Sequence, residues 1–397
     1  MSAGVKSGRA ALVTTGAELE HAVESARGAG AIGLDTEFMR ERTYRARLCL
    51  VQIATFDHVF LIDPLEGSRL SGVADLIADE SVEVVVHAGK QDLELFYEIY
   101  GVVPRKVFDV QLAAGFAGHG ASLPYGRLVE GVLGVTLEKG ESYTDWCRRP
   151  LTGAQLRYAG DDVRYLLGIA QRLKERLQVL GRLGWVEEEM RSLEDPDAYG
   201  IDPDEAWRKV AGRGTLSGRQ AAVLKEVARW REEAAARRNL PRGWVIKDPT
   251  LVEIARRRPS STGQLQAIRG MNVKETERSG KEILAAVEQG RRAPAIESPK
   301  AAGRALQMRA RMMAGLADAV VRARCEQAGI ATELVSTRSE LEAVLIEVFE
   351  GLRDGTNHRL LNGWRRDLAG QAVVDLARGR IAVKGVEGPP YVEEVAL

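Results

Sequence analysis

Apolar and polar positions alternate along the first hundred residues in a way that predicts strands and helices in turn. Short runs rich in Val, Ile and Leu predict strands at 31–37, 47–54, 58–63 and 82–86. Helical periodicity predicts helices at 69–78 and 92–100. Strands that alternate with helices favour an α/β domain in which a mixed sheet is flanked by helices.

Beyond residue 107 the pattern is helical. The helical pattern over 107–137 is broken at the glycines around Gly118 and Gly120, and a long helix is expected from Thr152, as its N-cap, to about residue 179. The polar segment between them contains Trp146, which either covers a site or, as the preferred interpretation, anchors the core.

The rest of the chain predicts two more helical regions. They cover 216–290 and 307–368 and are preceded by linkers at 194–205 and 291–303. The last residues, with Pro389 and Pro390, are expected to form a tail.

Length and composition favour a soluble protein of two or three domains. The chain has 397 residues, of which 45% are hydrophobic. No apolar run approaches the roughly 18 residues of a membrane span, and the N-terminus lacks the apolar core of a signal peptide. Cys49, Cys147 and Cys325 are scattered and lack metal-binding spacing, which predicts reduced thiols in the cytoplasm.

Opposite charges are segregated along the chain although the net charge is zero. Residues 1–200 carry 22 basic and 30 acidic side chains, residues 201–300 carry 21 and 13, and residues 301–397 carry 13 and 13. A basic region beside an acidic one suits an enzyme that acts on a polyanion, because one attracts phosphates and the other can hold metal ions. A basic surface that serves only solubility is the alternative.

Two carboxylates stand two residues apart in the first predicted strand. Asp35 and Glu37 therefore share one face of that strand. Their repulsion and loss of hydration are costly unless a proton or cation neutralises them, so they are candidate ligands for Mg²⁺ or Mn²⁺. The alternative is that Asp35 caps a helix and Glu37 is solvated.

Two further signals follow. Asp92 lies at a strand-to-helix junction, where it is either a functional acid or a helix N-cap. Tyr158 and Asp162 are separated by one helical turn and share a face, whereas Asp161 is expected to point to solvent. A half-buried Tyr beside a solvated Asp is the alternative for that pair, and no catalytic role is expected for His87.

Together these motifs resemble the three exonuclease motifs of the DEDD superfamily. The contexts Asp-Thr-Glu-Phe, His-Ala-Gly-x₂-Asp-Leu-Glu and Thr-Asp-Trp-x-Arg-Arg-Pro-Leu-Thr narrow the resemblance to bacterial ribonuclease D, over about residues 10–190. The superfamily's other branch has a His five residues before the final Asp. That position is Arg157 here, so the chain resembles the tyrosine branch.

The resemblance implies a ribonuclease H-like exonuclease domain at 10–195 and a set of site residues. Asp35, Glu37, Asp92 and Asp162 would hold two divalent metal ions, Mg²⁺ or Mn²⁺. Tyr158 would orient the attacking water, and Phe38 and Gln52 are expected to seat the terminal nucleotides. The catalytic residues implied are Asp35, Glu37, Asp92, Tyr158 and Asp162.

The basic region resembles an HRDC domain, a small helical module that binds nucleic acid, and is expected at 212–292. Arg242 and Arg256 are candidates for phosphate contact, or are solvated. The segment 303–372, with Trp364, resembles a divergent second HRDC domain, leaving 373–397 as the tail. Two all-α HRDC-type domains therefore follow the exonuclease domain, and the second is expected to pack on the other modules or to complete a ring.

The resulting hypothesis is a metal-dependent 3′–5′ exoribonuclease of ribonuclease D type. It would trim tRNA precursors and other small RNAs with single-stranded 3′ ends, releasing nucleoside 5′-monophosphates, as a cytoplasmic monomer with no membrane contact. The rivals are a DNA 3′–5′ exonuclease with the same acids and a non-catalytic nucleic-acid-binding protein. A Rossmann-type enzyme is excluded because no Gly-x-Gly-x₂-Gly turn follows the first strand.

Overall fold

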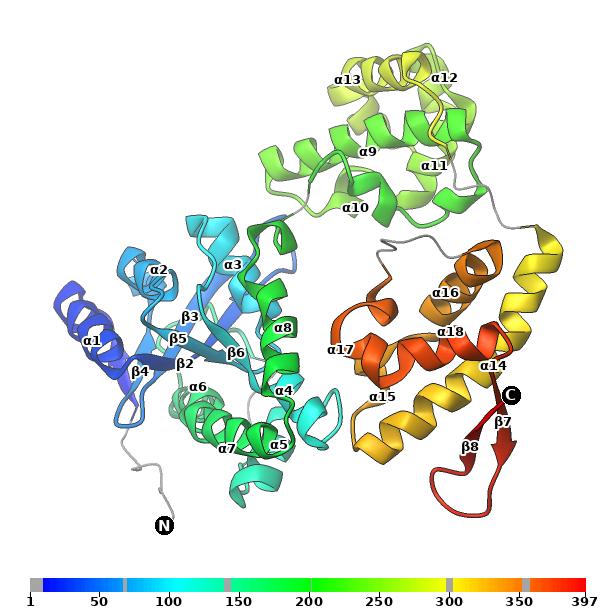
Figure 1. The fold of residues 1–397 in the computed structure, drawn as a ribbon. Helices are drawn as coiled ribbons and strands as arrows, with labels where there is room; N and C mark the ends of the chain where they lie inside the picture. Colours follow the sequence, from blue (N-terminus) through cyan, green and yellow to red (C-terminus); the bar gives the residue numbers. More distant parts are fainter. Residues whose placement is uncertain (1–9, 67–69, 139–143, 201, 298–302, 352–357) are drawn as a thin grey trace.

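A mixed sheet forms the centre of the N-terminal domain in the computed structural model, which describes residues 10–66, 70–138, 144–200, 202–297, 303–351 and 358–397 (Figure 1). Its strands are β1 (Ala11–Val13), β2 (Ala31–Met39), β3 (Arg47–Ala54), β4 (Val59–Ile62), β5 (Glu83–Val86) and β6 (Val107–Asp109). Their order is β1-β4-β3-β2-β5-β6, with β2 antiparallel to β3 and parallel to β5. The four predicted strands and the mixed sheet are confirmed.

Helices flank this sheet. They are α1 (Gly16–Ala29), α2 (Ser71–Ile77), α3 (Lys90–Tyr100), α4 (Val110–Ala117), α5 (Tyr125–Leu133), α6 (Gly153–Arg164), α7 (Leu166–Val179) and α8 (Leu183–Glu194). The helices α6 and α7 pack on the sheet around β2 and β3, and α8 packs on β6. Short 3₁₀ turns lie at Pro64–Glu66, Pro196–Ala198, Ala206–Lys209, Arg213–Thr215 and Arg359–Leu361.

Two expectations for this domain were wrong. The region from 107 begins with β6, because Asp109 both ends a buried strand and caps α4 through bonds to the N–H groups of Gln111 and Leu112. The single long helix after Thr152 is two helices that meet at Tyr165. The N-cap role of Thr152 is confirmed, because it forms a capping box with Gln155.

The first helical module has its own hydrophobic core. It consists of α9 (Gly218–Arg238), α10 (Arg242–Val245), α11 (Asp248–Arg257), α12 (Thr262–Gln266) and α13 (Val273–Arg292). Polar contacts join it to the segment that follows β2. The Tyr44 hydroxyl donates to Glu232, the Arg45 N–H donates to the Asn239 side chain over 3.0 Å, and the Arg242 guanidinium lies 4.9 Å from the centre of the Tyr44 ring.

The second helical module shares one continuous hydrophobic core with the exonuclease-like domain. It consists of α14 (Arg304–Ala328), α15 (Thr332–Val335), α16 (Arg338–Gly351), α17 (Gly363–Arg365), a π-helical turn (Arg366–Gly370) and α18 (Gln371–Ala377). Gly115 of α4 allows close approach, because a Cβ there would lie 2.7 Å from a methyl carbon of Leu334. The expectation that this region packs on another module is confirmed.

An ion pair lies within that shared core. Arg365 donates to both carboxylate oxygens of Glu189 on α8, and the Trp364 indole N–H donates to the same carboxylate over 3.0 Å. The Trp364 ring stacks on Trp185, with centroids 5.4 Å apart. Burial by itself raises the pKa of Glu189, but the bonds from Arg365 and Trp364 outweigh it and lower the pKa below its usual value.

Two other expectations need correction. The residues expected as a tail continue α18 and then form a hairpin of β7 (Ile381–Gly385) and β8 (Val392–Ala396), which Arg324 holds through an ion pair with Glu394. Cys49 and Cys147 are joined in a disulfide, whereas free thiols were predicted. Of the three, Cys325 is free and buried.

Among the described residues, no helix is both long and apolar enough to cross a membrane.

The Glu189–Arg365 pair yields a stability prediction. Replacing Arg365→Met leaves a buried carboxylate without its cation, and we expect the free energy of unfolding to fall by about 3 kcal/mol. Urea titration followed by tryptophan fluorescence measures it. Arg366→Met, at an exposed neighbouring position, should change it by less than about 0.5 kcal/mol. Equal effects for both variants would show that the pair does not hold the two domains together.

Candidate active site

The two acids of β2 lie beyond the end of a neighbouring strand. The parallel pairing of β2 with β5 covers only Ala31–Gly33, so Asp35 and Glu37 project past the carboxyl end of β5. Both side chains share the sheet face on which α6 packs. Gly33 lets that helix approach, because a Cβ there would lie 3.0 Å from the carbonyl oxygen of Val163.

Asp92 reaches the same place from the end of β5. It lies in the first turn of α3, is 8% exposed and accepts a hydrogen bond from the Thr36 hydroxyl of β2. It is not the N-cap residue of α3, which is Gly89. The helix N-terminus nevertheless favours a negative charge at this position.

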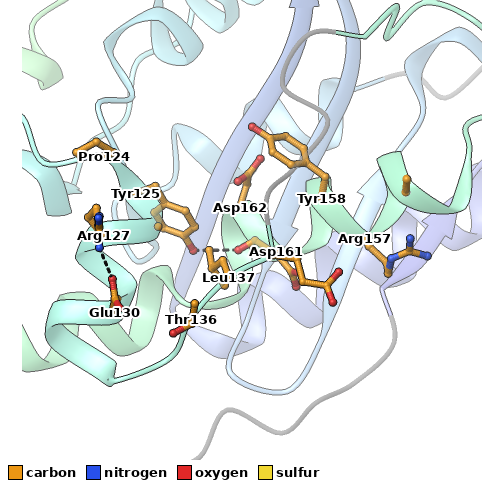
Figure 2. A pocket seen from close by; sticks show the side chains of 13 residues that line it. Pro124, Tyr125, Arg127, Glu130, Thr136, Leu137, Arg157, Tyr158, Asp161 and Asp162 are labelled. Atoms are coloured by element: carbon orange, nitrogen blue, oxygen red, sulfur yellow. Dashed lines mark hydrogen bonds and ion pairs between the residues drawn. The ribbon is translucent and has the colours of Figure 1, made fainter.

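The helix α6 supplies the remaining two residues. Tyr158 and Asp162 are one turn apart, and their side chains are hydrogen-bonded to each other. Figure 2 shows the Tyr158 ring above the Asp162 carboxylate, with the Arg157 side chain turned to the other side of the helix. Asp161 forms an ion pair with Arg164 instead of joining the acids.

Burial raises the pKa values of all four carboxyls, and repulsion from the other acids adds to the shifts of Asp35 and Glu37. Burial, then the charges of Asp92, Asp162 and Glu37, raise the pKa of Asp35 well above its usual range. Burial, then Asp162 and Asp92, raise the pKa of Glu37 to about 8. The charged neighbours that act on these two groups are therefore other carboxyls.

The other two acids are shifted less. Burial raises the pKa of Asp92 to about 6 against the opposing bond from Thr36, and raises that of Asp162 to about 7 against the bond from Tyr158. Burial, then Asp162 and Glu37, raise the pKa of the Tyr158 phenol, which is therefore neutral at physiological pH.

Four carboxylates with these properties suit hard divalent cations, which prefer oxygen ligands and would relieve the repulsion. The four carboxyl groups are close enough to interact electrostatically, but they are not arranged as a complete set of metal ligands. In this arrangement, no three His, Cys, Asp or Glu side chains of the described chain are grouped closely enough to hold a metal ion. The chemistry of the donors therefore fits a metal, and binding would draw the carboxylates closer together.

A cavity of about 670 Å³ opens beside Tyr158 and Asp162. Its walls include Tyr125, whose hydroxyl donates to the backbone carbonyl of Asp161 over 3.0 Å. Arg127 and Arg157 also line it, and Figure 2 shows Arg127 directed toward Glu130.

The predicted substrate contacts lie in different surroundings. Phe38 is partly buried against the core, and Gln52 is fully buried opposite Asp35 in the strand pairing. Neither polar atom of the Gln52 amide has a partner among the described residues. A nucleotide contact by Gln52 stays a prediction that requires the side chain to become accessible.

The predicted phosphate contacts in the first helical module have protein partners. Arg242 binds both oxygens of Glu232, over 2.6 and 2.7 Å, at the junction with the exonuclease-like domain. Arg256 binds Glu253 on its own helix and the Thr215 hydroxyl, and its side chain is 43% exposed. Their contact with phosphate stays a prediction.

Sequence reasoning missed Asp109, which orders the segment before Asp92. Its carboxylate accepts hydrogen bonds of 3.1 Å from the N–H groups of Ala88 and Gly89. The only sequence signal was an acid placed before a helical run, which is equally typical of an ordinary N-cap. His87 has no place among the acids and instead contacts the carbonyl of Leu123 over 3.0 Å.

Comparisons with known proteins find matches to the N-terminal domain and to the first helical module. A family model described as 3′-5′ exonuclease matches residues 10–178, and a model described as HRDC domain matches residues 220–287. The ribonuclease D of Granulibacter bethesdensis is 37% identical over 382 residues, covering 95% of this chain and 94% of its own. That of Gluconacetobacter diazotrophicus is 37% identical over 380 residues, covering 95% of both chains.

Solved structures extend the comparison. The crystal structure of Escherichia coli RNase D, described as an exoribonuclease involved in structured RNA processing, matches with a TM-score of 0.79 at 32% identity. The match covers 94% of this chain and 99% of that one. The catalytic core of RRP6 from Trypanosoma brucei matches with a TM-score of 0.54 at 25% identity, covering 72% and 80%.

The raised carboxyl pKa values predict a pH dependence. An acid whose pKa is raised on folding favours the protonated folded state, so without metal the stability should fall as pH rises from about 4.5 toward 8. Divalent ions need the ionised acids, so the gain in melting temperature with Mg²⁺ should be larger at pH 8 than at pH 6. Calorimetric scans with Mg²⁺ and with EDTA measure both. A gain that does not depend on pH would contradict this electrostatic description.

Proposed function

The chain belongs to the ribonuclease D family and is a 3′–5′ exoribonuclease, and on that premise we propose that it trims the 3′ ends of tRNA precursors and other small structured RNAs. The observation that carries this proposal is that four carboxylates from β2, α3 and α6 lie close enough to interact electrostatically beside the Tyr158 phenol. The products would be nucleoside 5′-monophosphates.

The four acids are proposed to hold two divalent ions, Mg²⁺ or Mn²⁺. When bound, these ions would supply an activated water and stabilise negative charge on the reacting phosphate. Asp35 and Glu37 would hold them from the rigid strand, and Asp92 and Asp162 from the two helices. Burial raises the pKa values of these carboxyls, and repulsion from the other acids adds to the shifts of Asp35 and Glu37, which supports this assignment.

Tyr158 is proposed to orient the attacking water through its hydroxyl. Because its pKa is raised, the phenol keeps its proton and can donate a hydrogen bond while its oxygen accepts another. Its bond to Asp162 would align it with the acids. Removing the hydroxyl should therefore lower kcat and leave substrate binding largely intact.

The cavity beside Tyr158 is proposed to receive the 3′-terminal nucleotide. Its volume of about 670 Å³ lies within the ordinary range for small-ligand sites, about 300–1,000 Å³. Arg127 and Arg157 at its walls would favour a phosphate. Phe38 is proposed to contact a base from the β2 side, and Gln52 after a change in accessibility.

The HRDC domain is proposed to hold the body of the RNA through phosphates, largely without reading sequence. The excess of basic residues over 201–300 supports this role. Arg256 is the better candidate contact, because its partner Glu253 lies on its own helix and is more exposed than Glu232, which holds Arg242 at the domain junction. We propose 10–195 and 212–292 as the limits of the exonuclease and HRDC domains.

We propose that the second helical module is a divergent HRDC domain that begins at 303. Its α14 ends at Gly329 in a left-handed conformation and is followed by the four-residue α15. In the same way α9 ends at Asn239 in a left-handed conformation before the four-residue α10. We propose that this domain extends past 372, the limit expected from the sequence, because α18 continues to Ala377. Its balanced charge supports a structural role.

We further propose that the protein works as a monomer in the cytoplasm. A DNA exonuclease with the same acids remains the rival, because carboxylates and metal ions select the phosphodiester and not the sugar. The match to an exoribonuclease over nearly the whole chain favours RNA.

The activity is tested with a tRNA that carries a 3′ extension. Purified protein with Mg²⁺ should shorten it from the 3′ end, EDTA should abolish shortening, and a DNA oligonucleotide of matched sequence should be degraded more slowly. Asp35→Asn should lower kcat at least about 100-fold, because loss of even an outer partner of a metal site costs about 10–100-fold. Asp75→Asn, at an exposed position on α2, is the matched control. Equal activities of the two variants would refute the site.

The role of the HRDC domain is tested by the salt dependence of RNA binding. Arg256→Ala should reduce the slope of log K against log salt by about 0.7–0.9, as expected for one lost phosphate contact. It should raise KM and leave kcat unchanged. Arg311→Ala, an exposed position on α14, is the control. An unchanged slope for Arg256→Ala would remove this residue from the RNA contact.

A further inference from the structure

The segment that leads into α6 places a buried aromatic ring against the proposed catalytic phenol. Trp146 is 3% exposed, and its ring centroid lies 6.0 Å from that of Tyr158. Its indole N–H has no partner among the described residues, so hydrogen bonding does not hold this ring. Core packing and the backbone that carries Trp146 therefore set its position.

Arg149 fixes that backbone. Its guanidinium donates to both carboxylate oxygens of Asp63, with Nη2 at 2.7 Å from Oδ1. It also donates over 2.7 Å to the backbone carbonyls of Cys49 and Trp146, and over 2.9 Å to that of Arg148. The side chains of Arg149 and Asp63 are only 17% and 2% exposed. A planar guanidinium bonded at this many points fixes direction as well as distance.

The anchor points lie on the part of the sheet that carries the acids. Asp63 follows the end of β4, and Cys49 lies in β3, which pairs with β2 across from Asp35. From the other side, the Gln155 amide of α6 donates to the Thr144 hydroxyl over 3.3 Å. The segment with Trp146 is thus fastened between the sheet and the helix that carries Tyr158.

We propose that Arg149 is a positioning residue for Tyr158, acting through Trp146 from its ion pair with Asp63. Replacing a buried ion pair with well-packed apolar side chains often leaves stability unchanged, so the geometric effect of this pair on the reacting groups can be tested in a folded protein. The inference rests on the proposed function, because it takes Tyr158 to orient the attacking water. The inference adds that buried contacts of Arg149 and Trp146 connect the sheet to the Tyr158 phenol.

The experiment is a double-mutant cycle on RNA cleavage. Arg149→Met alone would leave the buried Asp63 carboxylate without its cation. The main variant therefore combines Asp63→Leu with Arg149→Met, which removes both charges and fills the space with apolar side chains. Arg148→Met, at the exposed neighbouring position, is the control. Assays contain dithiothreitol, so that the bond between Cys49 and Cys147 does not hold the segment in place of the ion pair. Thermal unfolding confirms that each protein is folded.

The paired variant should lower kcat by about 10- to 100-fold, as expected when a reacting group is displaced by less than about 1 Å, with KM within about 2-fold. In a Tyr158→Phe background the same change should cost less than about 3-fold, because the group it positions is already gone. Trp146→Leu should behave in the same way and provides the test if the paired variant does not fold.

Other outcomes separate the two levels of the hypothesis. If Tyr158→Phe retains full activity, the proposed role of Tyr158 fails and the inference fails with it. The inference alone is overturned if Tyr158→Phe is impaired while the paired variant is fully active. It is also overturned if the paired change lowers kcat by the same factor in the Tyr158→Phe background as in the otherwise unchanged protein.

Discussion

Repulsion among desolvated carboxylates is the constraint on which the rest of the catalytic domain depends. Asp35 and Glu37 lie on the same face of β2, which fixes their separation. Asp162 and Asp92 approach them from two different helices. Folding therefore concentrates acidic groups on a central strand, beyond the carboxyl end of β5, at a cost that protons or cations must offset. The close approach at Gly33 and the ordering of Ala88 and Gly89 by Asp109 serve this same convergence.

The two helical modules contact this domain through different kinds of interaction. The second shares its hydrophobic core, with the Trp364 ring stacked on Trp185 and the Arg365 guanidinium bound to Glu189. The HRDC domain keeps a separate core and meets the segment after β2 through polar contacts around Tyr44. A polar junction of this kind costs less to open than a shared core, so the HRDC domain is the part better able to adjust to RNA.

The sequence predicted what depends on local pattern. Alternation placed Asp35 and Glu37 on one strand face, and helical spacing placed Tyr158 and Asp162 together. It missed β6, whose three residues give too short a signal before the stronger pattern of α4. It also missed the pairing of Cys49 with Cys147, since residues 98 apart meet only through the tertiary fold. Arg149 belonged to a recognised motif, but its partner Asp63 was invisible without coordinates.

Anomalous X-ray diffraction from crystals soaked in Mn²⁺ shows whether the acids, which are remote in sequence, converge to bind cations. We expect two anomalous peaks within bonding distance of Asp35, Glu37, Asp92 and Asp162, and their loss in the Asp35→Asn protein. Peaks elsewhere on the molecule, with none among these four carboxylates, would contradict this expectation.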